Sequence, residues 1–571
     1  FELGQQKINF NFYELSLPDD DPVFTLKKVM EEMDFTALLA QYSGKGKHGF
    51  NPIMKYGVLT YANMRGIREI DRIVELCKRD LAFIWLSQGE QPKRDAFYDF
   101  INKKLTPEIL DDLNYQLLRR LKKEGLITLE ALFIDGTKIE ANANRYTFVW
   151  RGTLNYHLVG LLDSIDSLYH KYNVLLEDNG YNEKYGLGNA MMFIIEGMDK
   201  VRAVIEKNRK RKLTKHKKLP NNTIIEIDNC SPLDILKLQK NLMMIAEGEG
   251  IGFVYGKGKK KSEMQQLYEE LDVCGSKLME YKECFEVMGK ERNSYSKTDL
   301  EATFMRMKDD HMMNGQLKPA YNVQIAVENY FIVHAYVSND RTDYNTLIPV
   351  VQKHIHAFGE VLKEATADSG YCSEKNLLFL KEHTIESYIK LQDHEQRKTR
   401  AYKENIGKYY NMTTQIYEDE HFYVCHDGRE LRHIRTEEKE MDGYTQTLEV
   451  YGCADCSGCE HKAQCLYKYN PEKDADKNKV MKINERWEAL KEKSHANIQS
   501  EKGILNRQIR SIQTEGHFGD IKENDDFRRF NHRTADKVYK KFMLYAIGRN
   551  INKYHRFLCN KIQKFEGKKE E

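Results

Sequence analysis

The sequence predicts a mixed α/β core that carries two insertions and follows an all-helical domain. Short apolar runs with strand character lie in residues 126–150 and 299–396, which are assigned to the core. Helical spacing of apolar residues dominates residues 1–125, the insertion 151–298 and the C-terminal part 491–571. A polar stretch, residues 397–490, holds a cluster of cysteines and is assigned as the second insertion. The fold class is therefore α/β with a helical and a Cys-rich insertion.

Residues 1–125 are predicted to form a helical domain that binds DNA. Apolar residues of Pro52–Lys78 recur at three- and four-residue spacing, and Pro92 is placed at the start of a further helix, Pro92–Lys104. Short helices with basic ends suit a helix-turn-helix-like unit, in which Lys93 and Arg94 would contact DNA. An ordinary helical bundle is the alternative.

The core elements are predicted from local patterns. A strand, Thr128–Asp135, ends in a carboxylate before Gly136 relaxes the backbone. The elements expected after it are a hairpin of Ala320–Val327 and Tyr330–Val337 that turns at Glu328-Asn329, a helix capped by Asp343, a strand Val361–Asp368, a helix from Ser373, a strand Ser387–Leu391, and C-terminal helices Ile504–Lys522 and Ala535–Leu558. Without the insertions, this is the element order of an RNase H-like domain.

Three carboxylates fall where that layout can use them. Asp135 lies on the first strand, Asp368 ends the fourth, and Glu515 lies on the late helix. Two divalent ions can activate a nucleophile and stabilise a leaving oxygen in phosphodiester cleavage, and Mg²⁺ or Mn²⁺ prefers carboxylate ligands. An Asp at a strand end can equally cap a turn. Lys522, seven residues after Glu515, is expected on the same helix face, where it would contact a DNA phosphate or simply pair with Glu515.

Basic residues are gathered in the helical insertion, although the net charge of the chain is only +2. Two runs are expected to contact DNA phosphates, Arg209, Lys210, Arg211 and Lys212 in the first and Lys260 in the second, Lys257–Lys261. Solvated loops are the alternative interpretation of both runs.

The clustered cysteines predict a metal site. The chain has 11 cysteines and opens without a secretory signal pattern, so their clustering favours metal over disulfides. Thiolates at C-x2-C spacing suit a structural zinc ion, which would fold an insertion that lacks its own core. Cys453, Cys456, Cys459 and Cys465 are the candidates on spacing; free cysteines or an iron–sulfur cluster are the alternatives.

Four motifs resemble those of bacterial insertion-sequence transposases of the DDE class, nearest to the eleven-eighty-two type. They are ALFIDGTKIEANANRYTFVW, KPAYNVQIAVENYFIVHAYVSNDRTDYNTL, ATADSGYCSEKN and SIQTEGHFGDIKENDDFRRFNHRTADKV. The N-terminal FNPIMKYGVLTYANMRGIREIDRIVEL resembles the family's helical domain, so the resemblance covers nearly the whole chain. It implies metal-dependent cutting at transposon ends and strand transfer into target DNA, with Asp135, Asp368 and Glu515 holding the two ions.

The resemblance also bears on neighbouring residues. Cys456, Cys459 and Cys465 match the family's C-x2-C-x5-C segment, which implies Cys425 as the fourth zinc ligand, with Cys453 as a competitor. Related transposases carry a Tyr and an Arg at fixed spacings before the Glu and a Lys seven after it. Lys522 matches, but the Tyr and Arg positions hold Gln508 and Ser511, and Arg510 lies one residue out of register.

The partners expected from this interpretation are double-stranded DNA, as transposon ends and as target, and a second copy of the chain on paired ends. No apolar run reaches the length needed to span a bilayer, so a cytoplasmic, nucleoid-associated bacterial protein without a membrane partner is expected. Two alternatives differ in kind: a catalytically inactive, transposase-derived DNA-binding regulator, and an RNase H-like nuclease without strand transfer.

Overall fold

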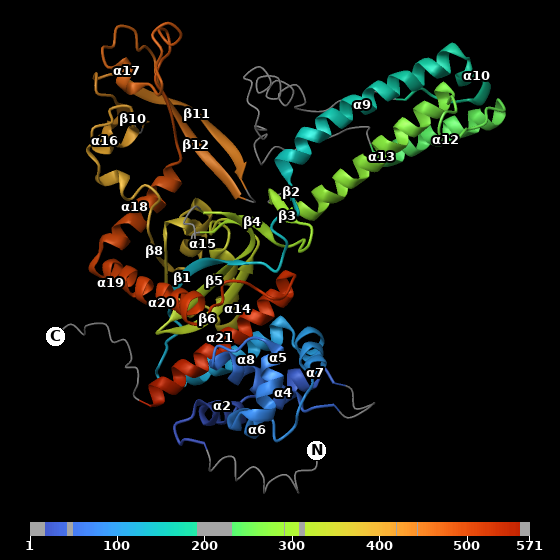
Figure 1. The fold of residues 1–571 in the computed structure, drawn as a ribbon. Helices are drawn as coiled ribbons and strands as arrows, with labels where there is room; N and C mark the ends of the chain where they lie inside the picture. The colour runs from blue at the N-terminus through green and yellow to red at the C-terminus, as the bar shows by residue number, and fades with distance from the viewer. Residues whose placement is uncertain are drawn as a thin grey trace.

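The computed structural model describes residues 17–42, 49–190, 231–289, 292–307, 315–417, 420–441 and 444–559. A helical N-terminal domain lies beside a mixed sheet, a long helical arm projects from one side of the sheet, and a second sheet stands apart from the first (Figure 1). The C-terminal helices return to the first sheet and to the N-terminal domain. The predicted mixed α/β fold class therefore agrees with the structure.

The N-terminal domain is helical, as predicted. Its elements are α2 (Pro22–Glu31), α3 (Thr36–Leu39), α4 (Pro52–Met64), α5 (Ile70–Arg79), α6 (Leu81–Leu86), α7 (Arg94–Asp99), the π-helix η1 (Phe100–Lys104) and α8 (Pro107–Lys123). Asn51 caps α4 by accepting from the amide of Ile53, and Pro52 fills the first helical position. The expected continuous segment Pro52–Lys78 is divided, because Gly66 (φ 70°) takes a left-handed turn after α4. Helix α7 begins at Arg94 instead of Pro92.

The central sheet has the strand order β6-β5-β1-β7-β8, with β4 also paired to β5. Strands β1, β7 and β8 run parallel, whereas β4, β5 and β6 form antiparallel pairs. The bounds are β1 (Ala131–Glu140), β4 (Thr303–Arg306), β5 (Leu317–Glu328), β6 (Phe331–Ser338), β7 (Glu364–Ala367) and β8 (Glu386–Ile389). The predicted hairpin and both later strands are confirmed.

The sheet corrects two local predictions and adds one strand. Strand β1 does not end at Asp135, because Gly136–Glu140 continue to pair with β5. The β5–β6 turn lies one residue later than expected, with positive φ at Asn329 and Tyr330. Strand β4 was not predicted; its four residues are too short for a clear sequence pattern.

Helices cover the sheet and join it to the N-terminal domain. They are α14 (Leu347–Phe358), α15 (Glu374–Glu382), α18 (Glu485–Gln499), α19 (Glu501–Arg510), η5 (Ser511–Glu515), α20 (Gly516–Gly519), η6 (Asp520–Asn524) and α21 (Ala535–Leu558). Helix α21 packs against α4, α8 and β6. One apolar cluster therefore runs from Val23 through Ile134 to Tyr554, so the N-terminal domain and the sheet share a core.

The α21–α4 contact predicts a large effect of one added methyl group. A Cβ on Gly548 would lie 2.9 Å from the Asn63 Cβ and 2.9 Å from the Met64 nitrogen, and the backbone at that point cannot move aside easily. Gly548→Ala is therefore expected to lower the free energy of unfolding by about 1–3 kcal/mol in denaturant titrations. Gly160→Ala, in helix α9 (Arg151–Asp178), is the control, because an added Cβ there would have no atom within 4 Å. Equal effects of the two changes would contradict the prediction.

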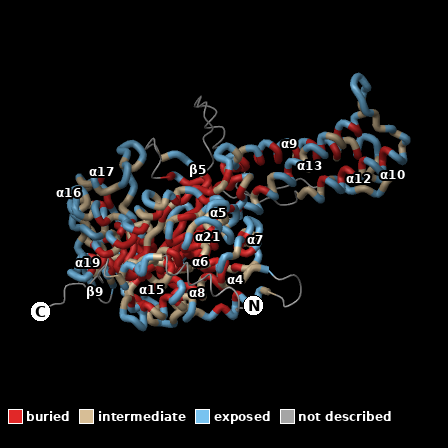
Figure 2. The backbone as a smooth tube through the Cα atoms, turned by 60° about the horizontal axis from the view of Figure 1, so that its bottom comes forward, coloured by how far each residue is buried: buried red, intermediate tan, exposed pale blue. Residues whose placement is uncertain are grey.

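The first insertion is a helical arm with its own apolar core. The short pair β2 (Phe148–Trp150) and β3 (Ser294–Ser296) forms its base, and α9 (Arg151–Asp178), α10 (Tyr181–Tyr185), α12 (Pro232–Gly248) and α13 (Glu263–Met288) form its length. Buried residues follow the inner faces of these helices (Figure 2), and cluster around Leu162, Leu242 and Leu271. The helical prediction for this insertion is confirmed, except for the two strands at its base.

The second insertion has more structure than the sequence indicated. It contains η3 (Gln396–Lys398), α16 (Arg400–Lys403), η4 (Tyr409–Asn411), α17 (Lys462–Cys465) and the strands β9 (Thr413–Tyr417), β10 (Glu420–Val424), β11 (Glu430–Met441), β12 (Tyr444–Cys453) and β13 (Val480–Ile483). The strands form one antiparallel sheet in the order β13-β12-β11-β10-β9. Leu431, Tyr451 and Ile483 pack in an apolar cluster, so the expectation that the insertion lacks its own core is wrong.

Within the described ranges, none of the helices combines the length and the apolar character that crossing a bilayer requires.

Candidate active site

Asp135 and Asp368 lie at the same level of two neighbouring parallel strands. The pairing of β1 with β7 includes Phe133 opposite Thr366. Asp135 lies two residues after Phe133 within β1, and Asp368 lies two residues after Thr366, directly after the end of β7. Asp368 caps the 3-10 turn η2 (Ser369–Tyr371) by accepting from the Gly370 amide at 2.8 Å. The predicted proximity of these two carboxylates therefore has a structural basis in the register.

Asp135 is largely buried, with 15% of its side chain exposed. Its Oδ1 accepts from the Gly136 amide at 2.8 Å, and its Oδ2 accepts from Arg510 Nη1 at 2.8 Å and from the Thr514 hydroxyl at 3.1 Å. Burial raises the pKa of Asp135 above its ordinary value, Arg510 opposes this, and the nearby charge of Asp368 adds to it. Apart from this shift, the closeness of the two carboxylates Asp135 and Asp368 makes this a place where a cation would be favoured.

Arg510 reaches this site because the helix that follows it is wound differently. Residues Ser511–Glu515 form the π-helix η5, which closes hydrogen bonds between residues five apart. Arg510 and Glu515 therefore stand one above the other, as residues four apart do in an α-helix. Arg510 is one residue out of the expected register in the sequence, and the π-helix brings it back onto the face of Glu515.

Glu515 is joined to Asp135 through that arginine. Its Oε1 lies 3.9 Å from Arg510 Nη2, while 63% of its side chain is exposed. Lys522 lies farther along, in a second π-helix, η6. Successive residues of the π-helices η5 and η6 are rotated by a smaller angle about the helix axis than in an α-helix. The expected regular α-helix with Glu515 and Lys522 on one face is therefore wrong. The structure thus links Asp135, Asp368, Arg510 and Glu515 beside the C-terminal end of β7.

The donor chemistry of the three carboxylates suits a hard divalent ion such as Mg²⁺ or Mn²⁺. Among the residues that the structure describes, no three His, Cys, Asp or Glu side chains form a cluster that could hold a metal ion. In the arrangement seen here, the Asp135 oxygen nearest the helix is paired with Arg510. The carboxylate oxygens are ligands of the kind that such an ion prefers. In this structure the Arg510 guanidinium supplies the positive charge beside Asp135.

The cysteines gather in the second insertion, away from these carboxylates (Figure 1). Burial raises the pKa of the Cys465 thiol, Lys479 opposes this, and the nearby thiols of Cys425, Cys456 and Cys459 add to it. The Cys453 thiol donates to the backbone carbonyl of Asp455 at 3.2 Å, and it also interacts with the thiols of Cys456 and Cys425. All five thiols are thus neighbours, so the structure does not separate Cys425 from Cys453 as the fourth ligand. Within the described residues they do not form a cluster that could hold a metal ion.

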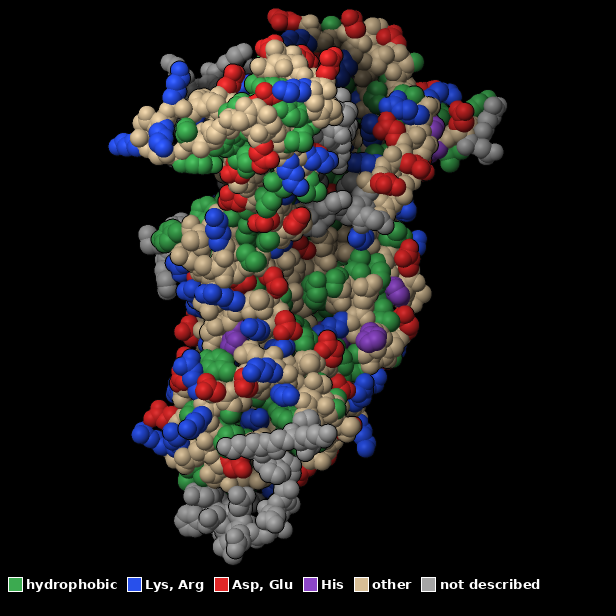
Figure 3. All heavy atoms as spheres, turned by 90° about the vertical axis from the view of Figure 1, so that its right-hand side faces the viewer, with side chains coloured by type: hydrophobic (Ala, Val, Ile, Leu, Met, Phe, Trp, Pro, Cys, Tyr) green, Lys and Arg blue, Asp and Glu red, His purple; other side chains and the backbone are tan. Residues whose placement is uncertain are grey.

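The basic candidates are spread over the molecule. Lys93 and Arg94 are exposed at the start of α7, where Arg94 lies 3.5 Å from the carboxylate of Asp71. Lys260 is exposed on the loop between α12 and α13 of the arm. Arg209, Lys210, Arg211 and Lys212 lie outside the described residues. On the face drawn in Figure 3, Lys and Arg side chains alternate with Asp and Glu instead of forming one patch.

Sequence reasoning missed two residues of this site, Arg510 as a positioned group and Thr514. The Thr514 hydroxyl donates to Asp135 and also lies 2.8 Å from the Arg510 carbonyl. The one signal in the sequence was that Arg510 lies five residues before Glu515 instead of four, a spacing that the i→i+5 bonding of a π-helix accommodates. A lone threonine in a helix leaves no such signal.

Two family models match parts of the chain. Residues 424–555 match a transposase DDE domain, and residues 11–103 match a transposase domain (DUF772). The first range includes Arg510, Glu515 and the clustered cysteines, and the second includes Lys93 and Arg94, whereas Asp135 and Asp368 lie outside both. No curated protein and no solved structure matches the chain. Both matches support a transposase of the DDE kind, which implies an enzyme that processes DNA with divalent metal ions.

Proposed function

We propose that this protein is an insertion-sequence DDE transposase, nearest to the eleven-eighty-two type, that binds the terminal inverted repeats of its element, cuts the DNA and transfers the 3′ ends to target DNA. The observation that carries the proposal is the shared level of Asp135 and Asp368 on adjacent parallel strands, with the Arg510–Glu515 helix packed against Asp135. The strand order 3-2-1-4-5 of β1, β5, β6, β7 and β8, with the second strand antiparallel, supports an RNase H-like core.

In this proposal Asp135, Asp368 and Glu515 hold two Mg²⁺ or Mn²⁺ ions. When bound, such ions activate the attacking oxygen and stabilise the departing one. The sheet holds the carboxylates of Asp135 and Asp368 in place, because the largely buried strands β1 and β7 are paired in a defined register. Arg510 orients Asp135 and stands beside Glu515, where its charge can also attract a phosphate.

DNA binding is assigned to separate surfaces. Lys522 would contact a phosphate near the cut, and Lys260 with the run Arg209–Lys212 would contact phosphates along the arm. Lys93 and Arg94 would contact the cognate end through the N-terminal domain. The long arm projects from the core next to β4 and β5 (Figure 1), which supports its role as an additional DNA contact. Two copies of the chain are proposed to hold paired ends at the bacterial nucleoid.

The test is cleavage of a supercoiled plasmid that carries the inverted repeats flanking the coding region, with and without Mg²⁺ or Mn²⁺. Cuts at the repeats and products joined to target DNA, both dependent on the cation, are the expected result. Cuts without joined products would favour an RNase H-like nuclease. Specific binding of the repeats without cuts would favour a DNA-binding regulator that has lost activity.

The second insertion is proposed to bind one structural zinc ion per chain through Cys425, Cys456, Cys459 and Cys465. Elemental analysis of the purified chain is expected to find about one equivalent of zinc. The double change Cys456→Ser with Cys459→Ser is expected to lose the zinc and lower the Tm, whereas Cys274→Ser, on α13 of the arm, should change neither. Full zinc content and an unchanged Tm in the double variant would contradict the proposal.

A further inference from the structure

Asp343, in the loop between β6 and α14, points its carboxylate at the sheet. The sequence predicts that Asp343 caps the following helix, but α14 has Thr346 at its N-terminal cap and no side-chain cap there. The amide and the hydroxyl of Thr346 both donate to the backbone carbonyl of Asp343, not to its side chain. The Asp343 Oδ1 instead accepts from Asn322 Nδ2 and Gln324 Nε2, each at 2.8 Å. The capping prediction is therefore wrong, because two amides of β5 compete for this side chain.

The donors to Asp343 are held in one orientation. Asn322 and Gln324 are buried, at 1% and 0% exposure. The Tyr371 hydroxyl donates to Gln324 Oε1, so the Gln324 amide nitrogen must face Asp343 and the Asn322 Oδ1. Tyr371 closes the turn that begins at Asp368. A continuous hydrogen-bond path therefore joins the Asp368 turn to the Asp343 carboxylate.

The backbone beside both proposed metal ligands leaves room for this carboxylate. A Cβ on Gly136, the residue after Asp135, would lie 2.7 Å from Asp343 Oδ1. A Cβ on Gly370 would lie 3.0 Å from Asp368 Oδ1 and 3.3 Å from Asp343 Oδ2. Oxygens of Asp343 and Asp368 thus border the same small space. A methyl group added at Gly136 would meet the Gln324 amide first and Asp343 next, and one added at Gly370 would meet Asp368 first and Asp343 next.

The negative charges of Asp343, Asp135 and Asp368 all act on the buried hydroxyl of Tyr371. Burial raises the pKa of Tyr371 well above its ordinary value, and the nearby charges of Asp343, Asp135 and Asp368 add to this, in that order. Arg510 is the cation that acts against them. Three carboxylates therefore surround one buried hydroxyl, with a single guanidinium to balance them there.

We infer that Asp343 is a fourth carboxylate of the proposed centre, a positioning residue that lies against the glycines beside Asp135 and Asp368 and adds negative charge that strengthens divalent-cation binding. The inference rests on the proposed function. It assigns Asp343 no direct bond to the ion, since its Oδ1 is taken by two amides and its Oδ2 faces Gly370 and Asp368. A negative charge this close to a divalent ion attracts it even without contact.

The test is Asp343→Asn, which keeps the Oδ1 acceptor and the side-chain shape and removes the charge. The full chain is titrated with Mn²⁺, and free Mn²⁺ is measured by electron paramagnetic resonance. Binding is expected to weaken about tenfold, with a similar rise in the Mn²⁺ concentration for half-maximal plasmid cleavage. Asp340→Asn is the matched control in the same loop, because the Asp340 carboxylate bonds to Ser338 and Asn345.

The outcomes separate the inference from the proposed function. Wild-type Mn²⁺ affinity in Asp343→Asn, together with instability in Asp343→Ala, would leave Asp343 only a structural support for β5 and overturn the inference. An equal loss in Asp340→Asn would also overturn it. If wild type and Asp135→Asn bind Mn²⁺ alike and neither cuts the plasmid, the proposed function itself fails.

Discussion

Asp135→Asn, Asp368→Asn and Glu515→Gln are each expected to reduce DNA cleavage by at least about a hundredfold. Each change keeps the size of the side chain but removes a charged oxygen that a divalent ion would bind. Asp135 and Asp368 share one level of the sheet, and Glu515 is held beside Arg510, so no neighbour replaces the lost ligand in kind. The measurement is single-turnover cleavage of the plasmid with inverted repeats.

The control for these variants is Glu523→Gln, which removes a carboxylate from the same C-terminal helical stretch. Glu523 forms an ion pair with Arg528. Among the described residues, no contact joins Glu523 to Asp135. It is expected to cleave at the wild-type rate. All three site variants should still bind the cognate end and unfold at the wild-type denaturant concentration. A variant that retains more than about a few per cent of cleavage would remove its residue from the proposed trio.

Acidification is expected to unfold the shared core well before the carboxylates titrate. Burial lowers the pKa of His354 to about 4, that of His517 to about 3 and that of His532 to about 4. Their pKa in the unfolded chain is about 6.5. As the pH falls below about 6.5, the unfolded state takes up protons that the folded state excludes, so the free energy of unfolding falls until the folded pKa is reached. By pH 4, each such histidine lowers the free energy of unfolding by about 3 kcal/mol.

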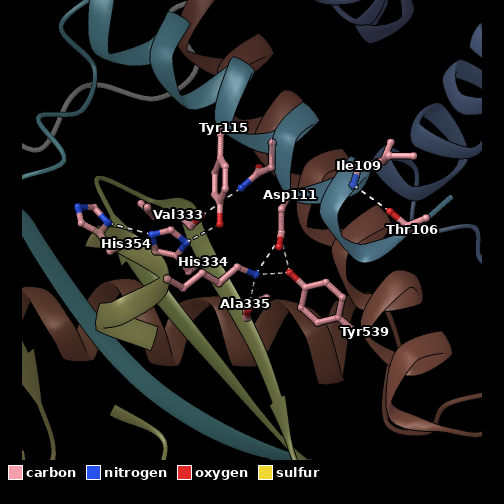
Figure 4. Close-up of polar contacts among 11 residues, drawn as sticks. Thr106, Ile109, Asp111, Tyr115, Val333, His334, Ala335, His354 and Tyr539 are labelled. Carbon is pink, nitrogen blue, oxygen red and sulfur yellow. Dashed lines mark hydrogen bonds and ion pairs between the residues drawn. The ribbon is translucent and has the colours of Figure 1, made fainter. Parts of the chain in front are cut away.

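His354 shows why the folded state excludes the proton. Its Nδ1 lies 2.9 Å from His334 Nε2, and its Nε2 lies 3.0 Å from the Leu129 carbonyl. Figure 4 shows His354, His334 and Tyr115 in sequence between β6, α14 and α8, where the N-terminal domain meets the sheet. A second positive charge in this buried pair would repel the first, and burial lowers the pKa of His334 further.

The measurement is denaturant unfolding at several pH values between 7.5 and 4.5. A loss of several kcal/mol between about pH 6.5 and 4.5 is expected. His354→Gln removes one of the groups that take up a proton on unfolding. The free energy of unfolding should therefore fall less steeply with decreasing pH than in the wild type. His356→Gln, two residues along the same helix, is the control, because His356 is exposed. The same slope in His354→Gln and wild type would contradict the assignment.

Local pattern was enough to predict most strands and helices of the core. Helix α21 was predicted as Ala535–Leu558 and has these bounds, and Ser373 caps α15 as expected. Spacing, caps and turn residues act within a few positions of the chain, so they can be read without knowing the fold. The same local reasoning placed Asp135 and Asp368 at strand positions whose common level the β1–β7 register then supplied.

Long-range partners decided the rest. The sequence assigned Asp343 to a helix cap, but amides on β5, about twenty residues earlier, hold its side chain. Arg510 lay outside the expected register until the π-helix η5 turned it toward Asp135, a residue 375 positions away. The second insertion has a polar composition, yet its strands bury enough of Leu431 and Tyr451 to form a core. In each case a contact distant in sequence outweighed the local preference, and only the folded chain supplies that contact.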